Sequence, residues 1–143
     1  MKIQLKRAYD PPDRTDGARV LVDRLWPRGV KKEDLDLRVW LKDVAPSTEL
    51  RQWFHARPRQ WPMFQKKYLQ ELREPQAAAA LTQLYEIAHS EPTTTLIYAA
   101  HDQEHNQAAI LKSLLEGMKK PPSSTGPVKA AAAGRKRAAA KKR

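Results

Sequence analysis

Two short apolar runs, ARVLVD at 18–23 and TTTLIYAA at 93–100, constrain the fold of this chain more than any other feature. Both contain β-branched residues, and neither shows the regular alternation of a strand with one face in water. Such strands are typical of a parallel sheet that is covered on both faces. A third run, KIQLKRAY, does alternate and predicts a half-exposed strand whose inner side carries Ile3, Leu5 and Tyr9.

Helical spacing of apolar residues fills much of the remaining chain. Ser47 can cap a short helix that begins in STELRQWF. Three more helices are predicted over RQWPMFQKKYLQEL (59–72), AAAALTQLYEIAH (77–89) and HNQAAILKSLLEGM (105–118). The spacing favours one buried helix face over a base-stacking surface for Trp53, Trp61, Phe64 and Tyr68. Strands interleaved with helices predict an α/β domain with a small, mainly parallel sheet flanked by helices, a Rossmann-like arrangement.

The net charge of +11 is concentrated at the C-terminal end of the chain. Residues 1–118 carry 18 Lys and Arg against 16 Asp and Glu, whereas residues 119–143 carry nine basic residues and no acidic one. The second segment joins a Pro/Ser linker to an alanine-rich stretch with too few large apolar residues to offset the entropy of ordering. We therefore expect one α/β domain over 1–118 and a disordered basic tail over 119–143.

The composition of this tail favours non-specific binding to nucleic acid, because its cations can replace the counterions of the phosphates. In composition alone, it resembles the Lys/Ala-rich tails of histone H1-like bacterial proteins. The alternative is a solvated tail that only aids solubility. The nucleic-acid contacts are expected from Lys129, Arg135, Lys136, Arg137, Lys141, Lys142 and Arg143.

Several classes of site are disfavoured by composition. The chain has no cysteine, so it can form neither disulfides nor thiolate metal sites. It contains no Gly-rich phosphate loop, and no cofactor is expected. His101 and His105 lack an obvious third ligand, and no metal site is expected. Because no run suits a membrane span or a signal peptide, we expect a cytoplasmic protein with no membrane partner.

The candidate site follows the first apolar run, in DRLWPRG at 23–29. Ligands of open α/β sheets gather beyond the carboxyl ends of the strands, and AAHDQEHN should lie at the same edge. The stretch from Trp26 to Gly29 predicts a turn that has proline second and glycine fourth and presents Arg28 outward. If Arg24 stacks on Trp26, the two arginines form a clamp for a phosphate or a carboxylate.

Two further residues belong to this candidate site. His105 or Asn106 is expected to cap the last helix, whose free backbone donors could hold the same anion, and Asn106 is the residue assigned to the site. Asp23 could act as a general acid or base while Arg24 holds a phosphorylated substrate. The alternative is structural: Asp23 pairs with a nearby arginine, and Trp26 only covers the core.

The segments VLVDRLWPRG, WLKDVAPSTELRQWFHARPRQWPMFQKKYLQEL and LIYAAHDQEHNQAAILKSLLE resemble the YeaO-like branch of the domain-of-unknown-function 488 family. The resemblance implies a Rossmann-like domain and matches Asp23 and Arg24 to an Asp-Arg pair of the family. Members of the wider family carry a Cys-His-Arg run after the last strand. That run falls here on Asn106, Gln107 and Ala108. The loss of the thiol and the imidazole implies binding rather than chemistry that needs those groups.

Two functional hypotheses follow. The first is a nearly neutral α/β domain that binds an anionic ligand, such as a phosphate-bearing small molecule, and is tethered to nucleic acid by its tail. The second is a small enzyme that acts on a nucleotide or a phosphorylated metabolite, with Asp23 and Arg24 at its site. A partner-binding domain without a small-molecule site is a third possibility.

Overall fold

The computed structural model describes residues 1–121. Its four strands form one sheet in the order β1-β4-β2-β3, and every pairing in it is parallel. The strands are β1 (Lys2–Arg7), β2 (Ala18–Leu21), β3 (Val39–Trp40) and β4 (Thr93–Tyr98). The predicted α/β fold with a small parallel sheet is confirmed.

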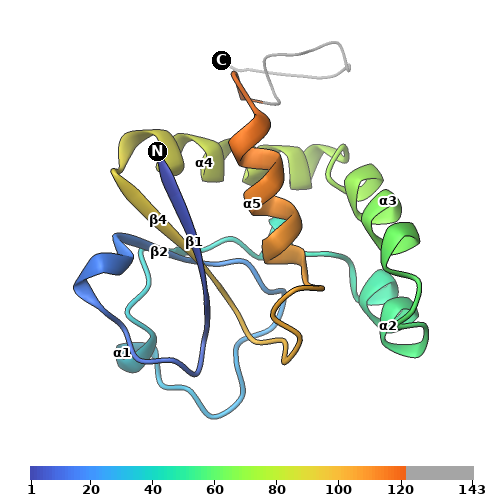
Figure 1. The fold of residues 1–143 in the computed structure, drawn as a ribbon, viewed down its shortest axis with the longest axis horizontal. Coiled ribbons are helices and arrows are strands. Elements are labelled where there is room, and N and C mark those ends of the chain that lie inside the picture. The colour runs from blue at the N-terminus through green and yellow to red at the C-terminus, as the bar shows by residue number, and fades with distance from the viewer. Residues whose placement is uncertain (122–143) are drawn as a thin grey trace.

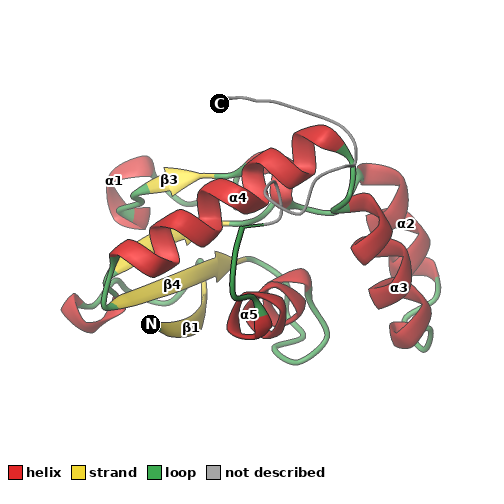
Figure 2. Ribbon diagram, turned by 90° about the horizontal axis from the view of Figure 1, so that it is seen from above, coloured by secondary structure: helices red, strands yellow, loops and turns green. Residues whose placement is uncertain are grey.

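Five α-helices and two 3-10 turns surround this sheet in the described part of the chain (Figures 1 and 2). The helices are α1 (Lys32–Leu35), α2 (Thr48–Ala56), α3 (Trp61–Glu71), α4 (Pro75–Ser90) and α5 (Gln107–Gly117). The 3-10 turns are η1 (Arg14–Asp16) and η2 (Lys42–Val44). None of the described helices is long and apolar enough to span a bilayer.

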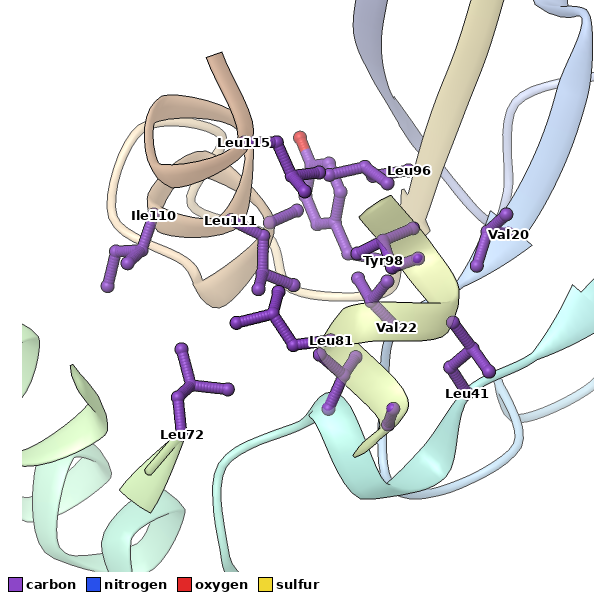
Figure 3. Packing of buried hydrophobic residues seen from close by; sticks show 14 of the residues in the cluster. Val20, Val22, Leu41, Leu72, Leu81, Leu96, Tyr98, Ile110, Leu111 and Leu115 are labelled. Carbon is purple, nitrogen blue, oxygen red and sulfur yellow. The ribbon is translucent and has the colours of Figure 1, made fainter. Parts of the chain in front are cut away.

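The two central strands bury side chains on both of their faces, as their unbroken apolar sequences predict. Val20 and Leu96 point into a large cluster that also includes side chains of α4 and α5, such as Leu81 and Leu111 (Figure 3). The neighbouring side chains along β2 and β4 face the opposite way, as alternation along a strand requires. That second face is smaller and is covered mainly by α1 and the segment 26–40.

The helix boundaries follow local capping signals. Ser47 accepts a hydrogen bond from the Leu50 backbone N–H, 3.0 Å away, and so caps α2 as predicted. Ser47 also donates to Glu71 at the end of α3 (Oγ to Oε2, 2.5 Å), which ties the two helices together. Pro62 lies in the first turn of α3, where a missing N–H does no harm.

One prediction for β1 is wrong. Ile3 is buried and Leu5 packs against the core, but Tyr9 lies beyond the end of the strand and is exposed. The chain turns after Arg7, whose backbone N–H is bonded to the Asp10 carboxylate, and this turn breaks the alternation.

A buried polar cluster supports the start of β2. The Asp16 carboxylate accepts hydrogen bonds from Arg19 at 2.6 Å and from Lys6 at 3.0 Å. Arg19 also donates from Nε to the Leu35 carbonyl at 2.9 Å, which anchors α1 below the sheet. Gly17, between these residues, has a φ of 65°. A Cβ there would lie 2.1 Å from the Thr93 carbonyl oxygen, so only glycine fits.

The predicted tail falls almost wholly outside the described residues, and all seven of its proposed nucleic-acid contacts do. The domain boundary at residue 118 therefore stays a prediction, although α5 ends one residue earlier.

Candidate functional site

The carboxyl ends of β2 and β4 meet at one edge of the sheet, as predicted, and Asp23 lies there. One carboxylate oxygen of Asp23 accepts a hydrogen bond from the Ala99 backbone N–H at 3.0 Å. The other accepts a hydrogen bond from the side-chain amide of Gln107, which also donates to the Val22 carbonyl at 3.3 Å. Asp23 thus joins β2, the segment after β4 and the first residue of α5.

The electrostatic environment of Asp23 is unusual for a carboxylate. Burial raises the pKa of the Asp23 carboxyl to about 6, although the hydrogen bonds from Ala99 and Gln107 and the charge of Arg51 favour its ionised form. Asp23 forms no ion pair within residues 1–121. The alternative prediction, a structural salt bridge between Asp23 and a nearby arginine, is therefore wrong for the described residues. Its partners are uncharged amides.

Arg24 points away from this carboxylate and toward the backbone that precedes α2. It donates from Nε to the Pro46 carbonyl at 3.1 Å and from Nη2 to the Ala45 carbonyl at 3.0 Å. Its Nη1 lies 3.9 Å from the Asp43 carboxylate. The guanidinium of Arg24 therefore holds a loop in place rather than facing an open site.

Trp26 packs on the second face of the sheet, and it is not stacked with Arg24. Its ring meets that of Trp40 edge-on, with centroids 5.4 Å apart. Both indoles donate to backbone carbonyls, Trp26 to Val30 at 2.6 Å and Trp40 to Asp23 at 2.7 Å. The predicted stacking of Arg24 on Trp26 is therefore wrong, and the Trp26 ring instead contacts the ring of Trp40.

The turn itself is displaced by one residue from its predicted position. The Val30 N–H bonds to the Pro27 carbonyl at 3.4 Å, so the four residues of the turn are 27–30. Gly29 then occupies the third position, where its φ of 80° is the value that glycine adopts most easily. Arg28 is exposed, as predicted, and has no hydrogen bond or ion pair with any residue in 1–121.

Asn106 caps α5, also as predicted. Its side-chain oxygen accepts from the Ala109 N–H at 3.0 Å, and its amide donates to the Asp102 carbonyl at 2.8 Å. The residue is only 3% exposed. Both ends of its side chain are therefore used inside the fold. The described residues hold no cluster of three or more acidic or histidine side chains that could bind a metal.

The sequence predicted the edge of the sheet at which Asp23 lies but not the contact of Asp23 with Gln107. The family resemblance identifies Gln107 only as a residue in the place of a histidine, and no sequence pattern indicates a role for Trp40 or Arg51. The order of the chain did contain a signal for Gln107. The first turn of a helix that follows a central strand lies beside the end of the adjacent strand.

A family model described as "Inactive DUF488-N3 subclade" matches residues 2–128. The chain belongs to this subclade. The uncharacterized protein YeaO of Escherichia coli K12 is 44% identical over 118 residues, which cover 82% of this chain and 100% of YeaO. The uncharacterized protein Rv3073c of Mycobacterium tuberculosis H37Rv is 40% identical over 116 residues, 81% of this chain and 95% of that protein. The same figures hold for the uncharacterized protein Mb3100c of Mycobacterium bovis. No solved structure matches the chain.

Membership of the DUF488-N3 subclade confirms the YeaO-like resemblance. The likeness of the tail to histone H1-like proteins stays a prediction from composition. The three residues at which the resemblance implies a lost Cys-His-Arg run have structural roles in this fold. Asn106 caps a helix, Gln107 binds Asp23, and Ala108 is buried in the core.

Proposed function

We propose that this protein is a non-catalytic α/β domain that its basic C-terminal segment tethers to nucleic acid. The observation that carries the proposal is the pairing of Asp23 with Gln107 and the Ala99 N–H. General acid–base or nucleophilic chemistry needs a reactive group that can reach a substrate atom. Here both oxygens of Asp23 accept hydrogen bonds from uncharged amides, and the residues on either side of Gln107, Asn106 and Ala108, carry no thiol or imidazole.

The tethering half of the proposal is supported by sequence alone. Residues 119–143 carry nine basic side chains and no acidic one, in clusters separated by alanines and prolines. Such a segment can follow a phosphate backbone without a preformed surface, and binding releases the counterions that the phosphates hold. We assign this role to Lys129, Arg135, Lys136, Arg137, Lys141, Lys142 and Arg143.

Within the domain, the proposal assigns binding of a phosphate-bearing small molecule to the turn at 27–30. Arg28 is the predicted anion-binding residue whose guanidinium is exposed and unpaired among the described residues. Arg24 and Asn106 direct their donors to backbone carbonyls, and we give them no ligand contact.

A second candidate function has one observation in its favour. A carboxyl with a pKa near 6 in a partly buried position is typical of a general acid or base, and Asp23 has this property. The alternative is an enzyme that acts on a nucleotide or a phosphorylated metabolite. The amide partners of Asp23 and the hydrogen bonds of Arg24 to the loop before α2 favour the non-catalytic function.

The test of tethering compares the full chain with a variant in which the seven tail residues named above become glutamine. Binding to a labelled mixed-sequence duplex is followed by fluorescence anisotropy over a series of salt concentrations. The tail variant should bind more weakly, and the slope of log K against log salt should fall by roughly 0.9 for each phosphate that the variant no longer neutralises. Equal binding by both proteins would refute the tether.

The test of catalysis is separate. Nucleotides and sugar phosphates are incubated with the full chain and followed by phosphorus NMR, and we expect no turnover. Turnover that disappears in Asp23→Asn would establish the enzyme instead.

A further inference from the structure

The charges of the folded domain are unevenly distributed, although their sum is small. Residues 50–70 contain five basic residues and no acidic one. This segment covers most of α2 and α3 and the loop that joins them, which we call the α2–α3 hairpin. Its basic residues are Arg51, Arg57, Arg59, Lys66 and Lys67.

The hairpin presents these cations to solvent. All five are exposed, and none forms an ion pair with a carboxylate in residues 1–121. Some exposed cations elsewhere in the domain are paired, for example Arg38 with Glu91 at 2.7 Å. Figures 1 and 2 show α2 and α3 side by side at one end of the long axis of the molecule. The five unpaired cations therefore give this end a positive potential.

Part of this positive surface is held in place by an aromatic ring. The Arg57 guanidinium lies 5.3 Å from the centre of the Trp53 ring, and the Lys67 ammonium lies 5.1 Å from it. Trp53 stands on α2 and packs against the core, so it holds one cation from the end of its own helix beside one from α3. The ring therefore restrains two positive groups, each of which can bind a phosphate oxygen.

An acidic groove lies toward the other end of the long axis. A surface groove of about 520 Å³ lies there between the segment 8–12 and α1, as the position of α1 in Figure 1 indicates. Its lining includes four carboxylates and no basic residue: Asp10, Glu33, Asp34 and Asp36. The carboxylates of this groove would repel a polyanion, whereas the cations of the hairpin would attract one. The domain therefore has one side that suits a phosphate backbone.

We propose that the α2–α3 hairpin is a nucleic-acid-binding surface of the folded domain, separate from the tail. Its cations contact the phosphodiester backbone and carry no base readout, because cations already lie over the ring of Trp53 and compete with bases for it. Binding by this surface is non-specific in sequence and sensitive to salt. The inference goes beyond the proposed tether, which concerns residues that the structure does not describe.

Nucleic acid suits this surface better than an anionic membrane does. Membrane-surface helices combine a basic face with a continuous apolar face. The exposed large apolar residues of α3 are Met63 and Leu69, 42% and 43% exposed. They are six positions apart, so they lie on different sides of the helix and form no apolar stripe.

If both surfaces bind, they reinforce each other. One chain then contacts a polyanion at the hairpin and again through its C-terminal segment, and the second contact becomes intramolecular. Removing either surface should weaken binding, and removing both should weaken it further.

The experiment uses the full chain in four forms: wild type, a hairpin variant, the tail variant described above, and the two combined. The hairpin variant is Arg57→Gln, Arg59→Gln and Lys67→Gln. We expect the hairpin variant to bind a mixed-sequence duplex roughly tenfold more weakly and to lower the salt slope by roughly 2 to 3. The loss should also appear when hairpin substitutions are added to the tail variant.

Two controls separate charge from folding. The variant Lys2→Gln, Lys31→Gln and Lys32→Gln removes three exposed cations away from the hairpin and should leave the salt slope nearly unchanged. The exchange Arg57→Lys with Lys67→Arg keeps both charges and should keep wild-type binding. Thermal unfolding of every variant shows whether the fold is retained.

The proposal fails if the hairpin variant, folded as judged by unfolding, binds DNA with the wild-type slope. It also fails if both sets of three substitutions lower the slope equally, since the effect would then report net charge alone. Loss of binding to phosphatidylglycerol vesicles with unchanged DNA binding would assign the surface to membranes and overturn it. A loss seen with the tail variant only would support the tether and refute the hairpin.

Discussion

Replacing Asp23 by asparagine should make the domain more stable at neutral pH, which is an unusual result for a partly buried polar residue. The ionised Asp23 carboxylate is held in a site where burial raises its pKa from 3.8 to about 6. Between these two pH values, the folded chain keeps a proton that the unfolded chain has released. Stability from this group is therefore fully present below about pH 4, falls as the pH rises toward 6, and is constant above that.

The size of the effect follows from the same pKa difference. A difference of about two pH units corresponds to about 3 kcal/mol at about 1.4 kcal/mol per unit. Protonated aspartic acid and asparagine are both neutral, and each keeps a carbonyl oxygen that can accept a hydrogen bond from Gln107 or Ala99, beside one O–H or one NH2 group. The two proteins should therefore have stabilities within about 1 kcal/mol of each other near pH 4. At pH 7 the asparagine variant should be more stable by about 2 to 3 kcal/mol.

The assay is urea unfolding of the full chain and of Asp23→Asn from about pH 4 to about pH 8, followed by tryptophan fluorescence and by circular dichroism. Asp16→Asn provides a comparison of opposite sign. Burial of Asp16 acts to raise its pKa, but hydrogen bonds from the Asp13 backbone, Lys6 and Arg19 outweigh it and hold the pKa below 3.8. Stability from Asp16 is therefore present above about pH 4 and is lost as the pH falls below that value.

Two outcomes would refute the reasoning about Asp23. A difference between wild type and Asp23→Asn that does not change with pH would mean that the carboxyl titrates normally. Destabilisation by about 1 to 3 kcal/mol at pH 7 would mean that Asp23 is ion-paired in solution.

Four further substitutions test the fold. Arg24→Lys should lower the free energy of unfolding in urea by about 1 to 2 kcal/mol, because one ammonium cannot reproduce the two guanidinium bonds to the loop before α2. Unchanged stability together with weaker phosphate binding would instead support Arg24 as part of an anion clamp. Gly17→Ala should destabilise by more than about 3 kcal/mol, because its Cβ would lie 2.1 Å from a carbonyl oxygen. Gly29→Ala has open space around the new Cβ, so it should cost only the strain of a positive φ, about 1 to 2 kcal/mol. Equal loss of stability in Gly17→Ala and Gly29→Ala, measured by thermal unfolding, would contradict this difference. Tyr68→Phe should lower the stability by about 1 to 2 kcal/mol, because it leaves the buried Val44 carbonyl without its hydroxyl donor, and an unchanged unfolding midpoint would refute this.

The sequence was sufficient to predict the features of the fold that depend on neighbouring residues. The uninterrupted apolar runs identified β2 and β4, and apolar spacing identified α3, α4 and α5 to within a few residues. The helix caps at Ser47 and Asn106 were predicted correctly because a cap depends on contacts only three residues away. The short elements α1 and β3 were missed, because four residues and two residues are too few to show a period.

The position of Asp23 at the edge of the sheet was predicted but its partners were not, because those partners lie far away in the sequence. The choice of Asp23 depended on where a parallel sheet places the ends of its strands. Its bond to Gln107 joins residues 84 positions apart. Arg24 appeared free to bind an anion because the carbonyls that it contacts lie 21 and 22 positions further along the chain. No local pattern reports such a partner.

The strand order has a consequence for how the protein is made. Both β1 and β2 pair with β4, and β4 begins only at Thr93, so most of the sheet must wait for the last strand. As the chain leaves the ribosome, the two early strands have emerged and can form only the two-residue pairing of β2 with β3. The apolar side chains of β2 remain available to chaperones, or to other nascent chains, during that interval. An mRNA cut before the codon for Thr93 would yield a polypeptide with two unpaired strand edges, and such a fragment should aggregate or be degraded rather than fold.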